Sequence, residues 1–149
     1  MRKIGIAALS WLVLMISACG SSQPLKINGF WIANLNNPDG TPAFGFTTNF
    51  MQGSGTAVNV TNFQASTPCF SSQTSETATF SATGSSNGVQ TAPFVMTIST
   101  EVSAAQNNMA TLQGSRDAVT RAINGSWTMT GPSGCTGNGL FTTNQPPRV

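Results

Sequence analysis

The sequence predicts an all-β protein, built as a small antiparallel up-and-down β-barrel of about eight strands. Apolar and polar residues alternate with a period of two along much of the chain, and turn signals recur at intervals of roughly 8–12 residues. No long stretch has helical periodicity. A β-sandwich is the alternative fold. Its immunoglobulin type has a Trp between two paired cysteines, whereas Trp31 and Trp127 both lie outside the interval from Cys69 to Cys135.

Each strand is predicted from the residues that fall together on one of its faces. In chain order these are Ile27, Gly29, Trp31, Ala33 and Leu35; Phe44, Phe46, Thr48 and Phe50; Val58 and Val60; a weaker Thr-rich strand over 77–83; Phe94, Met96 and Ile98; residues 109–114; Ile123, Gly125, Trp127 and Met129 within 122–131; and residues 139–143. Turn-forming residues at 37–40, 53–55, 84–88 and 131–134 separate the strands. Residues 115–121 fit either one helical turn or a hairpin loop.

A short pattern occurs twice, as Ile27-Asn28-Gly29-Phe30-Trp31 and as Ile123-Asn124-Gly125-Ser126-Trp127. Both copies place Ile, Gly and Trp on one face of a strand. We expect the two Trp side chains to be packing residues that close one end of the barrel, each ring folding over the bare backbone of its Gly. A coincidence in a chain rich in Asn, Gly and Thr, and a ligand-binding role for the rings, are the alternatives.

The triplet Gly29-Phe30-Trp31 resembles the Gly-x-Trp start of lipocalin-like and avidin-like barrels. The resemblance implies that Trp31 lies on the first strand and helps to close one end of the barrel. Two other lipocalin features, a Thr-Asp-Tyr triplet and a clear Arg on the last strand, are absent from the sequence. The chain also resembles small uncharacterised exported lipoproteins with a late Gly-Pro-x-x-Cys-Thr-Gly turn, here residues 131–137, a likeness that implies no activity.

The N-terminal segment has the layout of a secretory signal, with Arg2 and Lys3 before an apolar run of about thirteen residues. That run is shorter than the roughly 17–25 residues that a membrane-spanning helix needs. The residues Ile16-Ser17-Ala18-Cys19 resemble a bacterial lipobox. The resemblance implies that the signal helix is removed before Cys19, that Cys19 is lipidated, and that the protein is anchored to a membrane of the bacterial cell envelope. Gly20, in place of an Asp, favours the outer membrane.

These features divide the chain into a signal peptide (1–18), the lipidated Cys with a tether (19–25), a β-barrel domain (26–143) and a flexible tail (144–149). After removal of the signal peptide the chain holds four basic and four acidic residues, and its formal net charge is zero. The basic patch that nucleic-acid binding requires is therefore not predicted.

Two cysteines remain after Cys19. In an oxidising compartment Cys69 and Cys135 are expected to form a disulfide, which would tie a mid-chain loop to the turn before the last strand. Two free buried thiols are the alternative. No metal site is predicted, because the sequence has no His and two thiolates do not complete a zinc site.

The sequence offers little catalytic chemistry. Without His it lacks the commonest general base, and the four mature carboxylates are scattered, so they are expected to be solvated surface charges. The cluster of Arg116, Asp117 and Arg121 is expected to be a solvated loop. We predict no enzyme activity and no cofactor.

Three function classes follow. The first is an envelope lipoprotein with a structural or interaction role, whose partner would be another envelope protein. The second is a carrier of a small apolar ligand in a lipocalin-like barrel, and the third, an enzyme, is disfavoured. The candidate ligand-lining residues are Trp31, Phe44, Phe46, Phe50, Phe94 and Met96. In a small barrel the same side chains can simply fill the interior, and we favour that interpretation.

Overall fold

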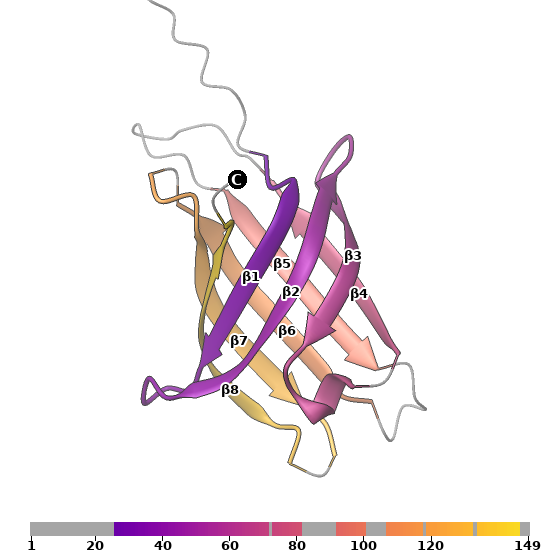
Figure 1. The fold of residues 1–149 in the computed structure, drawn as a ribbon, viewed down its shortest axis with the longest axis vertical. Coiled ribbons are helices and arrows are strands. Elements are labelled where there is room, and N and C mark those ends of the chain that lie inside the picture. The colour runs from indigo at the N-terminus through magenta and orange to yellow at the C-terminus, as the bar shows by residue number, and fades with distance from the viewer. Residues whose placement is uncertain are drawn as a thin grey trace, which may run out of the picture.

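Eight antiparallel strands close into one up-and-down barrel, which confirms the predicted fold (Figure 1). The computed structural model describes residues 26–71, 73–81, 92–100, 107–117, 119–132 and 134–146. Each strand pairs with its neighbours in the sequence, and the first strand pairs with the last, so the alternative of a β-sandwich is wrong. The strands are β1 (Gly29–Asn36), β2 (Pro42–Gln52), β3 (Ala57–Ala65), β4 (Thr74–Phe80), β5 (Pro93–Thr100), β6 (Met109–Arg116), β7 (Ile123–Thr130) and β8 (Gly137–Asn144), with a 3-10 turn η1 (Pro68–Phe70) between β3 and β4.

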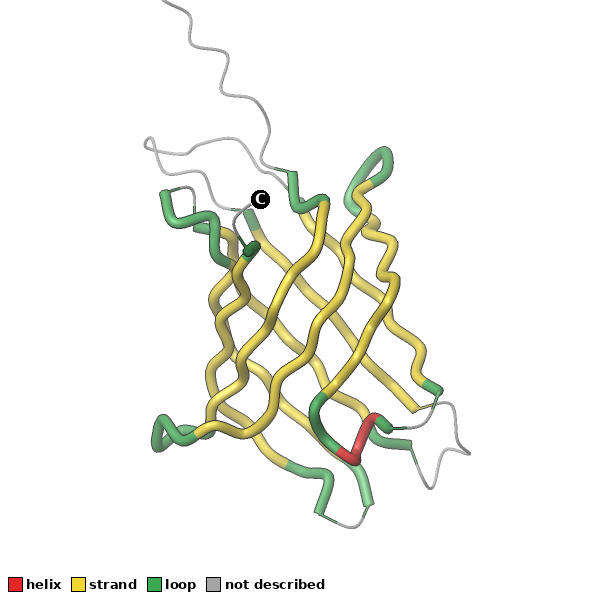
Figure 2. Tube along the Cα trace, in the orientation of Figure 1, coloured by secondary structure: helices red, strands yellow, loops and turns green. Residues whose placement is uncertain are grey.

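Figure 2 shows how little of the described chain is helical. The short turn η1 is the one helical element in this part of the molecule. Its Thr67 accepts a hydrogen bond from the Cys69 N–H, and Pro68 occupies the start of the turn, where a missing N–H costs nothing. The predicted signal helix, the predicted lipidation site Cys19 and the predicted tether lie outside the described residues.

The alternation of the sequence matches the alternation of burial. Along β1, β2, β5 and β7 every second side chain points into the barrel and is buried, and the residues between them face outward and are mostly Thr, Asn and Ser. Burial of this apolar face is the main favourable contribution to folding. The largest fully buried side chains are Trp31, Trp127, Phe50, Phe80, Phe94, Phe141, Ile27, Leu35, Met96, Ile98, Leu112 and Ile123.

The fourth strand begins earlier than predicted, at Thr74 in place of residue 77. The inward-facing positions of its first half are Thr74 and Glu76, so the sequence shows no apolar alternation there. The described residues of 115–121 form a turn between β6 and β7 to which no helix is assigned, and the Arg121 N–H donates to the Asp117 carbonyl over 3.0 Å. Arg116 ends β6, and the Asp117 N–H donates to the Ala122 carbonyl over 2.8 Å in the connection to β7.

The contact between β3 and β4 is the least regular part of the barrel. Only two residue pairs join these strands, Ala57 with Thr79 and Val58 with Ala78. Asn62 has a positive φ of 54°, and the register of β3 against β2 shifts beside it, as in a β-bulge. After the bulge the chain leaves β3 and enters η1, whose Phe70 is buried in the core.

The two ends of the barrel differ in what closes them. At one end lie the start of β1, the β2–β3 and β6–β7 connections and the end of β8 (Figure 1). We call this the Trp31 end. The opposite end, with the β1–β2 turn, η1 and the β7–β8 turn, is called the Trp127 end. At the Trp31 end Asn144 completes β8, and the side-chain amide of Gln145 donates to the Asn28 carbonyl over 2.7 Å.

Candidate functional site

The barrel interior holds all six side chains that the sequence offered as a ligand lining. Trp31, Phe44, Phe46, Phe50, Phe94 and Met96 all point inward and are buried. Phe50 on β2 contacts Phe94 on β5, with ring centroids 5.6 Å apart, and Phe94 contacts Phe141 on β8 at 6.4 Å. Trp31 joins the same chain of rings through Phe50 at 6.1 Å. Because β2, β5 and β8 stand on different sides of the barrel, these rings cross its interior and occupy the space that a ligand would need.

Two paired glycines allow this packing. Gly114 on β6 lies opposite Gly125 on β7, and a Cβ added to Gly114 would come within 3.0 Å of the Phe141 ring. A Cβ added to Gly125 would meet the main chain of Gln113 and Gly114. The glycines therefore leave room for Phe141 and let the two strands approach closely.

The Trp31 end is closed by a buried arginine. The Trp31 indole N–H donates to the Ile27 carbonyl over 2.7 Å, and the Arg116 guanidinium lies 5.6 Å from the centre of the indole ring, in cation–π range. Arg116 also donates to the main-chain carbonyls of Lys26 and Arg121. Burial, and secondarily the charge of Arg121, lowers the pKa of Arg116 from its ordinary value. This arginine thus ties the chain before β1 to the β6–β7 connection.

The expectation that Arg116 belongs to a solvated loop is wrong. Its side chain is only 6 % exposed. A signal was present in the sequence, because Arg116 continues the inward-facing series of Ala110, Leu112 and Gly114 on β6. The charge of Arg116 favoured a surface position, because arginine is seldom buried without partners. One of its two main-chain partners, Lys26, lies 90 residues away in the sequence.

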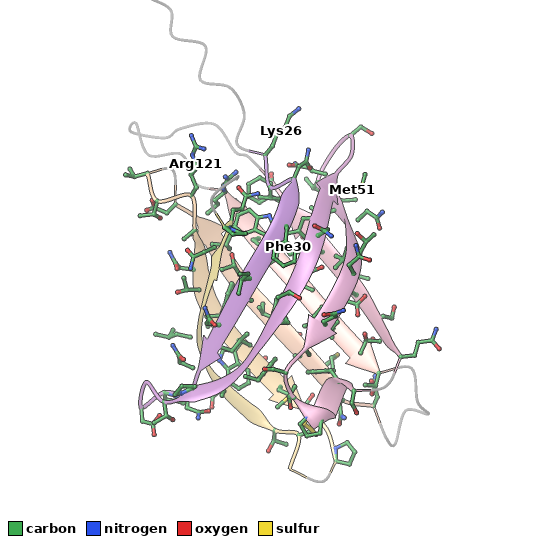
Figure 3. All side chains as sticks on the ribbon, viewed as in Figure 1. Lys26, Phe30, Met51 and Arg121 are labelled. Atoms are coloured by element: carbon green, nitrogen blue, oxygen red, sulfur yellow. A yellow bond between two sulfur atoms is a disulfide. The ribbon has the colours of Figure 1, made fainter. Side chains whose placement is uncertain are left out.

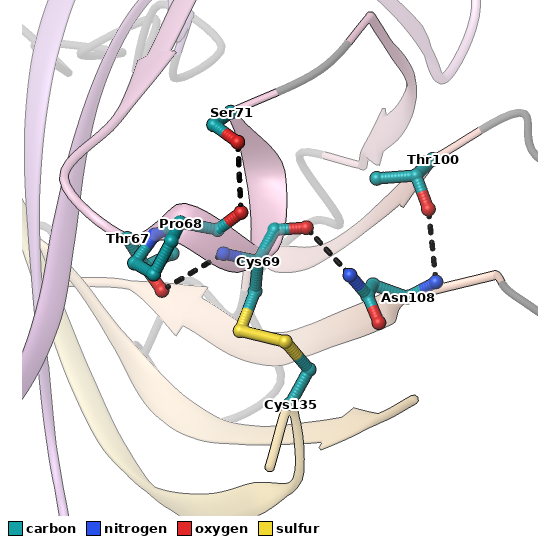
Figure 4. Close-up of a disulfide and its surroundings, with 7 residues drawn as sticks. All are labelled: Thr67, Pro68, Cys69, Ser71, Thr100, Asn108 and Cys135. Carbon is teal, nitrogen blue, oxygen red and sulfur yellow. Dashed lines mark hydrogen bonds between the residues drawn. A yellow bond between two sulfur atoms is a disulfide. The ribbon is translucent and has the colours of Figure 1, made fainter. Parts of the chain in front are cut away.

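The Trp127 end is closed by an aromatic group and a disulfide. The Trp127 indole N–H donates to the Asn36 carbonyl over 2.9 Å, and Phe44 meets the ring edge-on at 5.5 Å. Phe44 also contacts Phe70 of η1 at 6.2 Å. Cys69 of η1 is bonded to Cys135 of the β7–β8 turn, with a Cα–Cα distance of 5.7 Å, which confirms the predicted pairing and its place in the fold (Figure 4).

Hydrogen bonds hold the disulfide loop from both sides. The Asn108 side-chain amide donates to the Cys69 carbonyl over 2.7 Å, and the Asn108 main-chain N–H donates to the Thr100 hydroxyl over 2.9 Å (Figure 4). The Ser71 hydroxyl donates to the Pro68 carbonyl. The connection before β4 is therefore fixed to β5, β6 and the β7–β8 turn.

The repeated Ile-Asn-Gly-x-Trp pattern does not close a single end as expected, since its two Trp side chains serve opposite ends. The explanation offered for its glycines is also wrong. Gly29 is exposed with a φ of 118°, a conformation that favours glycine, and Gly125 allows strand approach. The ring of Trp127 lies instead over Gly137 and Gly139 of β8, where an added Cβ would stand 2.8 and 3.0 Å from ring atoms.

A shallow groove of about 360 Å³ lies on the outside of the barrel, across β1, β2 and the end of β3. Gly45 forms its floor, because a Cβ there would come within 2.8 Å of the Ala33 carbonyl. The Ser66 hydroxyl accepts from the Gly45 N–H over 2.8 Å and donates to its carbonyl over 3.1 Å, which extends the strand pairing along the groove. The outward side chains along it are Ile32, Asn34, Thr47 and Gln64. This is a mixed apolar and amide surface that sequence reasoning did not find.

The described carboxylates do not form a catalytic pair. Hydrogen bonds from the Thr41 hydroxyl and N–H lower the pKa of Asp39, in the turn at the Trp127 end. Hydrogen bonds from the N–H and hydroxyl of Thr120, and from the Val119 N–H, lower the pKa of Asp117 at the Trp31 end. Glu76 faces inward on β4 and is half-buried, with one carboxylate oxygen that has no hydrogen-bond partner among the described residues. It is therefore not the solvated surface charge that was expected.

Among the described residues, no group of three or more His, Cys, Asp and Glu side chains is placed to hold a metal ion. In the same part of the chain, no helix is long and apolar enough to cross a membrane. Comparison of the chain with protein-family models, with curated proteins and with solved structures gives no match. The candidate functional surfaces are therefore identified from the structure and sequence of this protein alone.

Proposed function

We propose that this protein is a lipid-anchored lipoprotein of the bacterial envelope, with a structural or interaction role and no catalytic activity. Its barrel is a rigid body held at the membrane by Cys19, and its outer surface makes the contacts with other envelope components. The observation that carries the proposal is the chain of contacting rings from Trp31 through Phe50 and Phe94 to Phe141. Side chains that fill the interior in this way support a function on the outer surface of the barrel over the binding of a ligand inside it.

The closure of both ends supports the same conclusion. A carrier needs a mouth through which its ligand passes. Here Arg116 joins two main-chain segments across the Trp31 end, and the Cys69–Cys135 bond holds η1 over the Trp127 end. Disulfides of this kind persist in exported proteins, which agrees with the envelope location that the N-terminal segment implies.

The anchor is supported by the residues Ile16-Ser17-Ala18-Cys19 and by the apolar run before them. Each buried methylene of an acyl chain contributes about 0.8 kcal/mol, and stable attachment takes more than one chain. Lipoprotein processing supplies two or three chains, which is sufficient. Gly20 supports the outer membrane as the destination.

The experiment is an intact-mass measurement on protein extracted from the membrane fraction of a Gram-negative host. We expect a mass above that of the 19–149 polypeptide by the mass of the acyl groups, and a Cys19→Ser variant without the added mass. A Cys69→Ser/Cys135→Ser variant is the matched control, because it also replaces cysteines by serine but should keep the lipid. A wild-type mass without acyl groups would contradict the proposal.

A further inference from the structure

The charges of the described residues are divided between the two ends of the barrel. Lys26, Arg116 and Arg121 all lie at the Trp31 end, with Asp117 as the one described acidic residue there. Asp39 and Glu76 lie toward the Trp127 end, where the described residues include no basic side chain. The Trp31 end is therefore positive and the opposite end negative, although the mature chain as a whole is neutral. Figure 3 shows Lys26 and Arg121 projecting from the Trp31 end.

Apolar side chains accompany the positive charges. Val119 in the β6–β7 connection is 90 % exposed, Met51 near the end of β2 is 61 % exposed, and Phe30 near the start of β1 is 43 % exposed. Together with Lys26 and Arg121 they lie at or near the Trp31 end, and we call these five residues the basic-apolar rim. Figure 3 labels Lys26, Arg121, Met51 and Phe30. Side chains of this composition suit the boundary between lipid headgroups and acyl chains, where basic groups meet phosphates and apolar groups leave water.

The length of chain before Lys26 favours the Trp31 end as the end that meets the membrane. Seven residue steps separate Cys19 from Lys26, and a fully extended chain covers at most about 25 Å over that length. The tilted eight-residue strands give the barrel wall a height of about 20 Å. The Trp127 end could meet the bilayer only if the tether ran, almost fully extended, along the whole barrel.

We propose that the Trp31 end rests on an anionic bilayer surface, with Lys26 and Arg121 against the headgroups and Val119, Met51 and Phe30 at the interface. This inference rests on the proposed lipid anchor at Cys19 and adds an orientation to it. The Trp127 end, with its disulfide and its two carboxylates, then faces away from the membrane. The anchored barrel has a fixed direction and does not swing freely on its tether.

Two native methionines report on this orientation without any substitution. Met51 belongs to the basic-apolar rim, and Met109 starts β6 at the Trp127 end, where it is 42 % exposed. Met96 and Met129 are buried and serve as internal standards of an intact fold. Met oxidation by an aqueous oxidant follows exposure, so Met51 should react faster than Met109 in a molecule that touches no membrane.

The experiment is a time course of hydrogen peroxide oxidation of the mature lipidated protein in phosphatidylglycerol-containing vesicles, read by peptide mass spectrometry. We expect the order to invert, with Met51 oxidised several-fold more slowly than Met109. In phosphatidylcholine vesicles, and for a Lys26→Gln/Arg121→Gln variant on the anionic vesicles, the protection of Met51 should fall. Equal protection on both lipids would overturn the role of charge.

The remaining outcomes separate this inference from the anchor. Protein that stays on the vesicles but oxidises at Met51 first, or is protected at Met109 instead, overturns the orientation and leaves the anchor intact. Protein that carries no lipid and does not stay on the vesicles overturns the proposed function, and this inference with it. Oxidation of Met96 and Met129 at the rate of Met51 would mean that the barrel is not the packed body described above.

Discussion

Trp31 and Trp127 occupy the same place in the repeated pattern Ile-Asn-Gly-x-Trp, yet different partners hold them at opposite ends of the barrel. Both rings are buried, and both indole N–H groups donate to a main-chain carbonyl. Around Trp31 the closure is made by a buried guanidinium and its hydrogen bonds. Around Trp127 it is made by Phe44, η1 and a covalent bond. A shared local pattern places a ring on the inner face of a strand, and distant residues decide how that end is sealed.

The two ends also differ in whether their closure is covalent. The Trp127 end is fixed by a disulfide between segments 66 residues apart in sequence. The Trp31 end is held by non-covalent contacts and carries the chain that leads to Cys19. In the orientation proposed above, the end held by reversible contacts faces the membrane and the covalently closed end faces away from it.

The largest expected effect comes from removing either ring. Trp31→Ala and Trp127→Ala should each lower the free energy of unfolding by about 3–5 kcal/mol, because each leaves a large cavity in a packed core. Trp127→Ala should lie at the upper part of this range, since the disulfide restrains collapse at its end. Chemical denaturation of each variant measures this. The control is Phe30→Ala, an exposed aromatic that should change stability by no more than about 0.5 kcal/mol. A Trp variant as stable as this control would contradict the packing role.

Removing the disulfide tests the covalent side of the comparison. A Cys69→Ala/Cys135→Ala variant should lose about 4 kcal/mol of unfolding free energy in the chain-entropy model, because the bond closes a long loop in the unfolded state. Denaturation of the non-reduced wild type beside the variant gives the difference. An unchanged stability would show that η1 and the hydrogen bonds of Asn108 hold this end without the bond.

Removing the guanidinium tests the non-covalent side. Arg116→Met should cost about 2–3 kcal/mol, because it removes charge-assisted hydrogen bonds to two carbonyls and the contact with Trp31. Arg121→Met is the matched control, since its side chain is exposed, and it should stay within about 0.5 kcal/mol of wild type. An equal loss of unfolding free energy in the two variants would contradict the role of the Arg116 guanidinium in closing the Trp31 end.

The smallest effects are expected from one aspartate at each end. Hydrogen bonds lower the pKa of Asp39 and of Asp117, so each carboxylate stabilises the folded state at neutral pH. That contribution is present above the unfolded-state pKa of about 4 and is lost as the pH falls through the lower folded-state value. Melting temperatures of wild type, Asp39→Ala and Asp117→Ala should therefore differ at pH 7 and converge below about pH 4. A difference that grows on acidification would contradict the sign.

The sequence predicts the strands well where one face is apolar, as in β2 with Phe44, Phe46 and Phe50, because burial of that face dictates a period of two. It misplaces the start of β4, since the inward residues there are Thr74 and Glu76. It predicts the disulfide because, with Cys19 assigned to the predicted lipid anchor, only one intramolecular pair of cysteines remains.

The closures and the outer groove could not be predicted in the same way. Trp127 donates to the Asn36 carbonyl and Arg116 to the Lys26 carbonyl, each about 90 residues away in the sequence. Every residue has a main-chain carbonyl, so the sequence does not single out these two as partners, and closure of the barrel brings them into reach. The groove depends on the close approach of Gly45 to the Ala33 carbonyl and on the hydrogen bonds between Gly45 and Ser66. The closures and the groove depend on where the main chain runs, and the alternation of apolar and polar side chains does not predict this.

We propose that the barrel is filled and closed at both ends and that its function lies on its outer surface. The most direct test is an equilibrium titration of the 20–149 domain with the apolar fluorophore N-phenylnaphthylamine, followed by energy transfer from Trp31 and Trp127. We predict no saturable transfer by the folded protein, because contacting rings occupy the interior and both ends are closed. Saturable binding with one site per folded chain, lost in Phe94→Trp, would contradict this account and establish the barrel as a ligand carrier.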